Sequence, residues 1–237
     1  MYGWRAKIGL VVPANNTVIE PELNKISPPG VSIHAMRLWT QSCDMAEQLS
    51  EMERLVRGRV MELVVAGVDV IVYACMATGL IKGPKWAEDF VTWIGDTFGI
   101  RATTASRATV AALHHLKVRR IALITPYPPE LNELVIPFFE TCEFEVTEMV
   151  NLPISDLREV CRIPPEMVYR LGRGIKTDPQ AICILATDLR SIESIEALEH
   201  DVGKPVVSTN QAIFWQALKT VGVNQDLRGY GDLLRNK

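Results

Sequence analysis

Short apolar runs alternate with amphipathic segments along most of this chain, and this alternation predicts its secondary structure. In the first half, the expected strands are residues 7–12, 31–38 and 69–74, with a short one at Arg101. The run DVIVYA at 69–74 is apolar almost throughout, which is typical of a central parallel strand covered on both faces. The expected helices begin at a Thr17–Glu20 capping box and otherwise cover residues 44–66, 86–98 and 106–116.

The same order of segments returns in the second half. Its expected strands are residues 119–125, 144–150, 181–186 and 205–207. Its expected helices are residues 130–140, 165–175, 191–200 and 210–221. Alternating strands and helices predict parallel sheets with helices on both faces.

The restart has the form of a sequence repeat. IGLVVP at Ile8–Pro13 resembles IALITP at Ile121–Pro126, and VDVIVYAC at 68–75 resembles PQAICILA at 179–186. We therefore predict an α/β fold with two similar Rossmann-like lobes that face each other across a cleft.

Each lobe is expected to contribute one set of strand ends to that cleft. The N-terminal lobe is predicted to comprise residues 1–104 and 208–237 and to carry Cys75. The C-terminal lobe is predicted to comprise residues 105–207 and to carry Tyr127 and the Ala186–Arg190 loop. Ligands of open α/β sheets bind at the carboxyl ends of strands. The ends expected to converge are Pro13–Thr17, Cys75–Gly79, Pro126–Tyr127 and Ala186–Arg190.

Cys75 is the first candidate for chemistry. It ends a buried strand and precedes Met76–Gly79, which we expect to be a loop of mostly small residues whose free amides bind a carboxylate or enolate oxygen. Such amides can also lower the pKa of the thiol. Met76 begins this substrate-binding segment. The alternative interpretation is a buried cysteine that packs as a small hydrophobe.

Polar residues at the other strand ends supply the remaining candidates. Asn16, Thr17 and Tyr127 can donate hydrogen bonds to a substrate carboxylate, although a helix cap and a surface tyrosine are the alternatives. Thr187 and Asp188 occupy the loop equivalent to that of Cys75. Asp188 is an acid, a base or, as the favoured single role, a helix cap before the helix expected at 191–200.

Composition narrows the class of protein. The 237 residues carry a net charge of −3 with no Lys/Arg run, which argues against nucleic-acid binding. The start lacks a signal-peptide pattern and the apolar stretches are too interrupted to span a membrane, so a cytoplasmic protein is expected. The five cysteines have irregular spacing and no CxxC, which predicts neither a metal site nor a disulfide framework. Cys43, Cys142, Cys161 and Cys183 are expected to be inert, and His114 and His115 to lie away from the cleft.

Several of these motifs together resemble a known family. VPANNT followed by EPE, YAC, ITPY and LATDLRSIESIEALEHDVGKPVVSTNQAIFWQAL are similar to the maleate cis–trans isomerase and arylmalonate decarboxylase group of the Asp/Glu racemase superfamily. The ectoine-utilisation proteins of that group are also similar. The resemblance implies two pseudo-symmetric lobes, an active site between them and no metal or organic cofactor. On the family's motifs, Cys75 matches a catalytic cysteine, and Asn16 and Tyr127 match substrate-binding residues.

The chain departs from the family pattern at the second lobe. The family's second cysteine falls on Ala186, the asparagine that follows it falls on Asp188, and a further asparagine falls near Leu157. Paired-thiol racemisation is therefore disfavoured unless Asp188 replaces the missing group.

Three functions remain open at this point. The first is isomerisation of a maleate-like dicarboxylate through a Cys75 thiolate adduct, with Asp188 as acid. The second is decarboxylation of a malonate, with Cys75 protonating the enediolate. The third is a non-catalytic carboxylate-binding protein. A homo-oligomer is expected, with the 44–66 helix as a possible dimer face, and Gly79–Pro84 is a candidate lid.

Overall fold

The computed structural model describes residues 2–39, 45–152, 154 and 157–235. Within them, the strands form two four-stranded parallel sheets with helices packed on their faces, which confirms the predicted α/β class. The first sheet has the order β2-β1-β3-β4 and the second has the order β6-β5-β7-β8. The second sheet thus repeats the strand order of the first, as the sequence repeat predicts.

The strands lie close to their expected positions. The first sheet contains β1 Ala6–Pro13, β2 Val31–Leu38, β3 Val70–Tyr73 and β4 Arg101–Thr104. The second contains β5 Arg120–Thr125, β6 Glu145–Asn151, β7 Ala181–Ile184 and β8 Val206–Ser208. Every residue of β3 and β7 is buried, as expected for strands covered on both faces.

The helices follow the strands in alternation. Those of the first half are α1 Ile19–Ile26, α2 Met45–Arg59, α3 Met61–Val65, α4 Met76–Lys82, α5 Pro84–Phe98 and α6 Ala105–His115. Those of the second half are α7 Pro129–Thr141, α8 Pro165–Arg173, α9 Ile192–Val202 and α10 Thr209–Val221. Two short 3₁₀ helices are η1 Leu157–Arg162 and η2 Asp232–Leu234.

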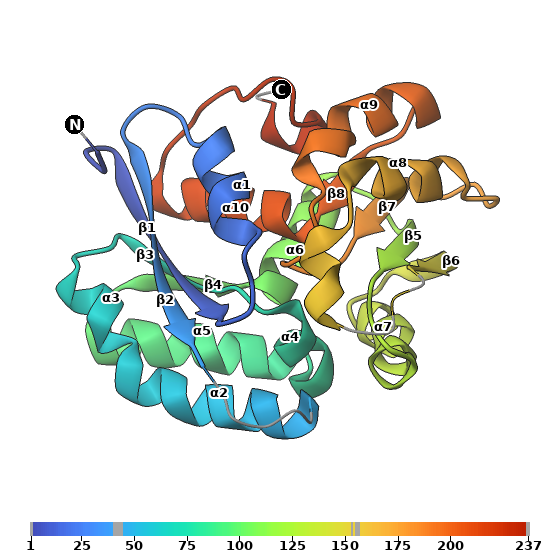
Figure 1. Cartoon of the computed structure of the whole chain (residues 1–237). Helices are drawn as coiled ribbons and strands as arrows, with labels where there is room; N and C mark the ends of the chain where they lie inside the picture. The colour runs from blue at the N-terminus through green and yellow to red at the C-terminus, as the bar shows by residue number, and fades with distance from the viewer. Residues whose placement is uncertain (1, 40–44, 153, 155–156, 236–237) are drawn as a thin grey trace.

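The pleat of the first sheet sorts its side chains into two cores. Val70 and Val72 of β3 pack in the core that includes α1 and α10, whereas Ile71 and Tyr73 face the core formed with α2 and α5. Figure 1 shows the same division, with α2 and α5 on one side of the strands and α1 and α10 on the other. Because successive side chains of a strand point to opposite faces, an apolar run fills both cores.

Two expectations about the first half are wrong. The helix expected over 44–66 is divided into α2 and α3 at Val60, and Asp44 lies outside the described residues. Met76–Gly79 is the beginning of helix α4 and not a loop. The candidate lid Gly79–Pro84 is helical except at Gly83, whose φ of 80° ends α4 just before Pro84 opens α5, and its role as a lid stays a prediction.

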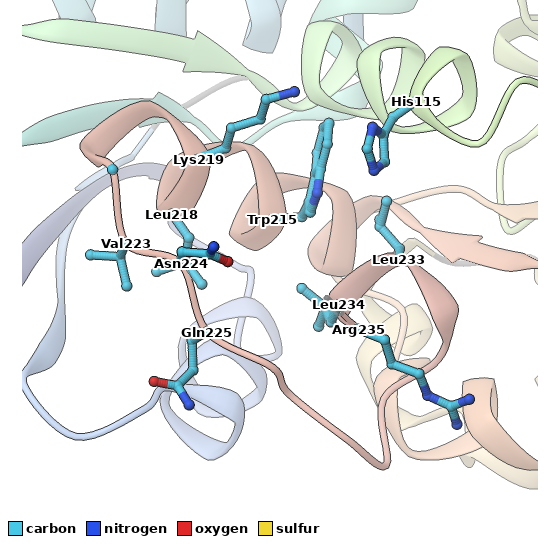
Figure 2. Close-up of a pocket in the computed structure, with 11 residues that line it drawn as sticks. His115, Trp215, Leu218, Lys219, Val223, Asn224, Gln225, Leu233, Leu234 and Arg235 are labelled. Carbon is cyan, nitrogen blue, oxygen red and sulfur yellow. The ribbon is translucent and has the colours of Figure 1, made fainter. Parts of the chain in front are cut away.

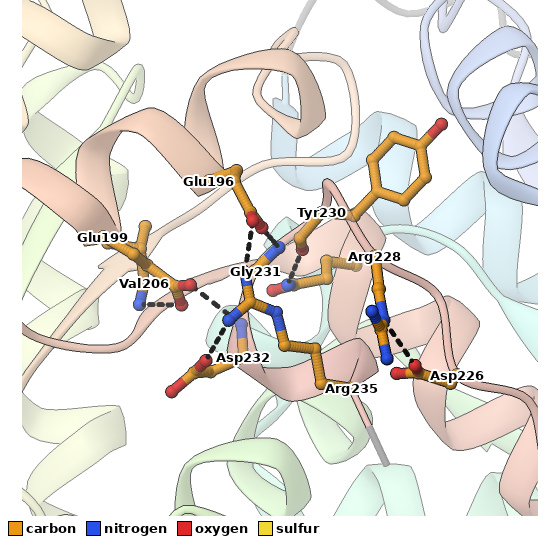
Figure 3. A network of polar contacts seen from close by, with 10 residues as sticks. Glu196, Glu199, Val206, Asp226, Arg228, Tyr230, Gly231, Asp232 and Arg235 are labelled. Atoms are coloured by element: carbon orange, nitrogen blue, oxygen red, sulfur yellow. Dashed lines mark hydrogen bonds and ion pairs between the residues drawn. The ribbon is translucent and has the colours of Figure 1, made fainter.

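The segment after α10 is tied down by a polar network on α9 (Figure 3). Glu196 accepts a hydrogen bond from the Gly231 amide at 2.9 Å, and Glu199 accepts one from the Asp232 amide at 2.8 Å. Helix α10 itself packs against β3, β4 and α6. The lobe boundaries at 104/105 and 207/208 therefore stay a prediction, because this last segment contacts elements of both halves.

The docking of α4 depends on a close approach at Gly79. A Cβ built on Gly79 would overlap the Oγ and Cβ of Ser106 in α6, so no side chain fits there without movement. Gly95 in α5 has open space around the same position. The two glycines are both inside helices, but only Gly79 holds two helices together.

We expect Gly79→Ala to lower the free energy of unfolding by about 1–3 kcal/mol, because the overlap outweighs the gain in helix propensity. Gly95→Ala is the matched control and should raise it by about 0.5–1 kcal/mol. Urea unfolding of the three proteins measures both values. Equal effects of the two substitutions would contradict the close approach.

Candidate active site

A pocket of about 90 Å³ lies where strand ends of both sheets meet. Its lining from the first half is Pro13, Asn15, Asn16, Leu49, Met52, Cys75, Met76 and Ala77. Its lining from the second half is Pro126, Tyr127, Leu131, Val160, Ala186, Thr187 and Asp188. The structure thus brings together every candidate of the sequence analysis except Thr17, which is exposed and is not part of this lining.

Cys75 is placed by the end of β3 and the start of α4. The Ala74 amide still donates to the Val11 carbonyl of β1 at 2.8 Å, and Cys75 follows as the extended N-cap residue of α4. Burial raises the pKa of the Cys75 thiol, and the nearby Asp188 charge raises it further. The Thr78 hydroxyl and the amides of Ala77 and Thr78 lower the pKa but do not outweigh burial. The site therefore holds a protonated thiol beside donors that favour the thiolate.

Asp188 is a half-buried carboxyl in the same pocket. Burial raises its pKa from 3.8 to about 6, while its own backbone amide opposes the shift. The favoured role of Asp188 as a cap of the following helix is wrong, because the Ser191 and Ile192 amides at the start of α9 donate to Glu22 instead. Asp188 is thereby left to the pocket, with a pKa suited to proton transfer near neutral pH.

Asn16 links the two sheets and also caps α1. Its Oδ1 accepts hydrogen bonds from the Val18 and Ile19 amides at 3.0 and 3.1 Å. Its Nδ2 donates to the Thr187 hydroxyl at 3.0 Å. The capping box expected from Thr17 is therefore wrong: the helix has no side-chain cap at its own N-cap residue, and Asn16 satisfies those amides.

Tyr127 and Thr187 complete the polar side of the pocket. The Tyr127 hydroxyl is buried and has no hydrogen-bond partner among the described residues. Burial raises its pKa well above 10, with the Asp188 and Cys75 charges adding to the shift, so it is a permanent donor. Thr187 donates through Oγ1 to the Ala74 carbonyl at 3.1 Å, next to Cys75.

Part of the pocket lining is an apolar wall. It is formed by Leu49 and Met52 of α2, Leu131 of α7 and Val160 of η1. The described lining contains no Lys, Arg or His, so a bound carboxylate depends on neutral donors. Arg190 is exposed and pairs with Glu193 at 3.1 Å.

The remaining cysteines and histidines lie elsewhere. Cys183 is fully buried in β7, and His114 and His115 are exposed, as expected. Cys142 and Cys161 are half-buried and are not part of the lining, and Cys43 lies outside the described residues. In the described part of the chain, no cluster of three or more His, Cys, Asp or Glu could hold a metal ion. None of the helices described combines the length and apolarity needed to span a bilayer.

A larger pocket of about 310 Å³ lies between α10 and the C-terminal segment (Figure 2). Trp215 stands at its centre, with the His115 ring 5.0 Å away and the Lys219 ammonium 4.9 Å from the ring centroid. Its described lining has no cysteine and no carboxylate. The two reactive candidates, Cys75 and Asp188, meet in the smaller pocket and not in this one.

Sequence reasoning missed two groups of residues. Leu49 and Met52 appear in the sequence only as part of an amphipathic helix, and nothing local shows that they face the pocket. Glu22 and Asn210 are buried polar residues bonded to each other at 2.7 Å across 188 positions of sequence. The only local signal for them is their place in the EPE and STNQA segments.

The chain is similar in sequence to a family of known proteins. The family model described as arylmalonate decarboxylase matches residues 8–234. Maleate isomerase of Nocardia farcinica is 29% identical over 240 residues, which cover 97% of this chain and 95% of that protein. Arylmalonate decarboxylase of Bordetella bronchiseptica is 29% identical over 168 residues, which cover 68% of this chain and 70% of that protein.

A solved structure of the N. farcinica maleate cis–trans isomerase is similar throughout. It is 27% identical, with a TM-score of 0.89, and the match covers 98% of this chain and 99% of that one. That protein is a cysteine-to-serine mutant with a covalently bound succinylcysteine intermediate.

The raised pKa of Asp188 predicts a pH-dependent cost in stability. Between about pH 4 and 7 the unfolded chain loses the Asp188 proton before the folded protein does, so the folded state loses stability as pH rises. Asp188→Asn removes this cost. The variant should gain about 1–3 kcal/mol over wild type at pH 7 relative to pH 4, the lower values reflecting partial solvent access.

Denaturant unfolding of both proteins at several pH values measures this difference. Glu193→Gln is a useful comparison because ion pairing with Lys25 lowers the pKa of Glu193, so its effect has the opposite sign. A stability difference between Asp188→Asn and wild type that does not change with pH would contradict the raised pKa.

Proposed function

The chain belongs to the arylmalonate decarboxylase family, and we propose that it is a cofactor-independent isomerase of a small maleate-like dicarboxylate that acts through a Cys75 adduct. Relatives of this family are named as maleate isomerase and arylmalonate decarboxylase, so the chain is an enzyme of this kind. The observation that carries the proposal is the meeting of one thiol, Cys75, and one carboxyl, Asp188, in a single pocket.

Cys75 is the proposed nucleophile. The Asp188 carboxylate takes the thiol proton, and the thiolate adds to one carbon of the double bond, which gives an enediolate at the neighbouring carboxyl group. Asp188 returns the proton to the adjacent carbon, and the product is a succinyl-cysteine. The succinylcysteine intermediate in the N. farcinica enzyme supports this type of adduct.

Rotation and elimination complete the proposed cycle. The former double bond is now single and rotates, after which Asp188 removes the proton again. The electron pair of that C–H bond forms the trans double bond as the carbon–sulfur bond breaks, and the thiolate is regenerated. Asp188, with a pKa raised to about 6, can act in both directions near neutral pH.

Neutral donors are proposed to hold the two carboxylates. The Tyr127 hydroxyl has no partner in the described structure and is available at once. The Asn16 side chain and the amide of Met76 lie at the same strand ends. The Thr187 hydroxyl already donates to the Ala74 carbonyl, so its predicted binding role requires substrate to displace that bond. Donors fixed in a partly desolvated pocket also stabilise the charge that develops on the enediolate. Thr17 is exposed in the turn between β1 and α1, so it keeps its proposed binding role only if substrate reaches that turn. The homo-oligomer stays a prediction.

Decarboxylation of a substituted malonate is the second candidate, and the apolar wall favours it. Leu49, Met52, Leu131 and Val160 suit a hydrocarbon substituent that maleate lacks. In this reaction a carbon–carbon bond breaks, carbon dioxide leaves and the electrons form an enediolate. The Cys75 thiol then protonates the carbon, and solvent or Asp188 reprotonates the thiolate. Only one thiol is needed, which accords with Ala186 at the second position.

Cys75→Ser should reduce turnover about a thousandfold or more, because a hydroxyl is a far weaker nucleophile and acid. Proton NMR in heavy water, with maleate and a series of substituted malonates, follows the product. A fumarate-like product supports the isomerase, and a singly deuterated monoacid supports the decarboxylase. Cys142→Ser, outside the pocket, is the control that should keep full activity.

Failure of wild type to convert any of these acids would refute both reactions. A non-catalytic carboxylate-binding protein, or a different acid, would then have to be considered. Full activity in Cys75→Ser would instead move the chemistry to Asp188.

Tyr127→Phe tests recognition separately from folding. The hydroxyl has no hydrogen-bond partner among the described residues, so the free energy of unfolding should change by less than about 1 kcal/mol. Loss of a donor to a charged substrate should lower kcat/KM by about 10–100-fold. Steady-state kinetics and thermal unfolding on the same samples check the two halves. A stability loss with unchanged kinetics would show that Tyr127 only packs.

A further inference from the structure

Glu22 of α1 is a buried carboxyl outside the pocket that accepts hydrogen bonds from both α9 and α10. It lies on α1 with 8% of its surface exposed. Its Oε1 accepts hydrogen bonds from the Ser191 and Ile192 amides at 2.7 and 3.1 Å, at the start of α9. Its Oε2 accepts one from Asn210 Nδ2 at 2.7 Å. Three hydrogen bonds to its two oxygens fix the orientation of the Glu22 carboxyl.

Asn210 passes this restraint to the pocket. Its Nδ2 also donates to the Thr187 carbonyl at 3.0 Å, so both of its N–H groups are engaged. Its Oδ1 is buried and has no hydrogen-bond partner in the described structure. A reversed amide would put that oxygen against the Glu22 carboxyl and the Thr187 carbonyl, which are both acceptors. Glu22 therefore fixes which way the Asn210 amide points.

The hydrogen bonds of Glu22 and Asn210 restrain both ends of the segment 187–191, which carries Asp188 and is called the Asp188 segment below. Thr187 is held through Asn210, and Ser191 is held by Glu22 directly. Just before this segment, Ala186 has a φ of 85°, a left-handed conformation that a non-glycine residue keeps only where its surroundings enforce it. Thr187 in turn bonds to the Ala74 carbonyl, one residue before Cys75.

We propose that Glu22 is a positioning residue. It acts through Asn210 and the α9 amides to hold the Asp188 carboxyl at a fixed position relative to the Cys75 thiol. The inference rests on the proposed function in that Cys75 and Asp188 are the reacting pair. It adds that their relative position is set by a carboxyl that is not part of the described pocket lining.

The chain offers a matched control on the same two helices. Lys25 of α1 and Glu193 of α9 also form an ion pair, but their side chains are 51% and 40% exposed. Ion pairs between solvent-exposed side chains contribute little to the free energy of folding. Glu22 and Glu193 therefore differ in burial and in the link to Thr187, while both join α1 to α9.

Glu22→Gln keeps the shape of the side chain but places an NH₂ group against a donor, either the Asn210 NH₂ or the α9 amides. We expect kcat to fall about 10–100-fold with KM within about threefold, because a displacement of the Asp188 segment misaligns the reacting groups. Glu193→Gln should change neither value. Kinetics are measured well below the unfolding temperature of each variant, so that lost folding does not imitate lost positioning.

Asn210→Ala tests the route. If Glu22 acts through Asn210, this variant should also lower kcat, and the double variant should lose less than the product of the two single effects. A fall in kcat for Glu22→Gln but not for Asn210→Ala would overturn the route through Asn210. Unchanged kcat in Glu22→Gln would overturn the proposal as a whole.

A second measurement needs no substrate. Alkylation of Cys75 by iodoacetamide, followed by peptide mass spectrometry, should be about threefold faster or more in Glu22→Gln, because a looser segment opens the thiol to solvent. It should be unchanged in Glu193→Gln. If wild type converts no acid, the proposed function fails and labelling alone decides: equal rates in wild type and Glu22→Gln overturn the positioning role.

Discussion

A buried chain of hydrogen bonds between the two sheets is the constraint on which the site depends. Asn16, at the end of β1, donates to Thr187, and Thr187 donates to the Ala74 carbonyl at the end of β3. Each bond adds little net free energy, but a buried partner left without one costs about 1–3 kcal/mol. The strand ends of one sheet therefore cannot shift against those of the other without several such losses. This is what keeps Cys75 and Asp188 in one pocket.

The burial that holds Cys75 and Asp188 in place also raises the free-energy cost of ionising them. Desolvation raises the pKa of both groups, which keeps the Cys75 thiol protonated and brings the pKa of Asp188 to about 6. The donors beside Cys75 oppose the rise in its pKa without outweighing burial, so transfer of the thiol proton to Asp188 costs free energy. A site of this kind trades stability for reactivity, as is common where function needs buried ionisable groups.

The pocket combines features of two reactions named among its relatives. Its polar side supplies neutral donors and a single thiol, and its other side is an apolar wall from α2, α7 and η1. The resemblance of the motifs implies that Ala186 stands at the position of the family's second cysteine, and Asp188 follows two residues later. The proposed chemistry therefore pairs a thiol with a carboxyl instead of two thiols, and Asp188 is the proposed proton carrier. In the two proposed reactions, the apolar wall favours a substituted malonate, whereas maleate has no hydrocarbon substituent to contact it.

The sequence by itself determined the strands, their repeated order and the residues at their ends, because burial and local periodicity are written in neighbouring positions. The positions of Cys75, Tyr127 and Asp188 at strand ends follow from these patterns alone. Only the tertiary structure decided which groups cap which helix: Asn16 replaces Thr17 on α1, and Glu22 replaces Asp188 on α9. These bonds compete across elements up to 188 residues apart in sequence. A carboxyl or an amide satisfies the nearest buried donor in space, and no local pattern records which donor that is.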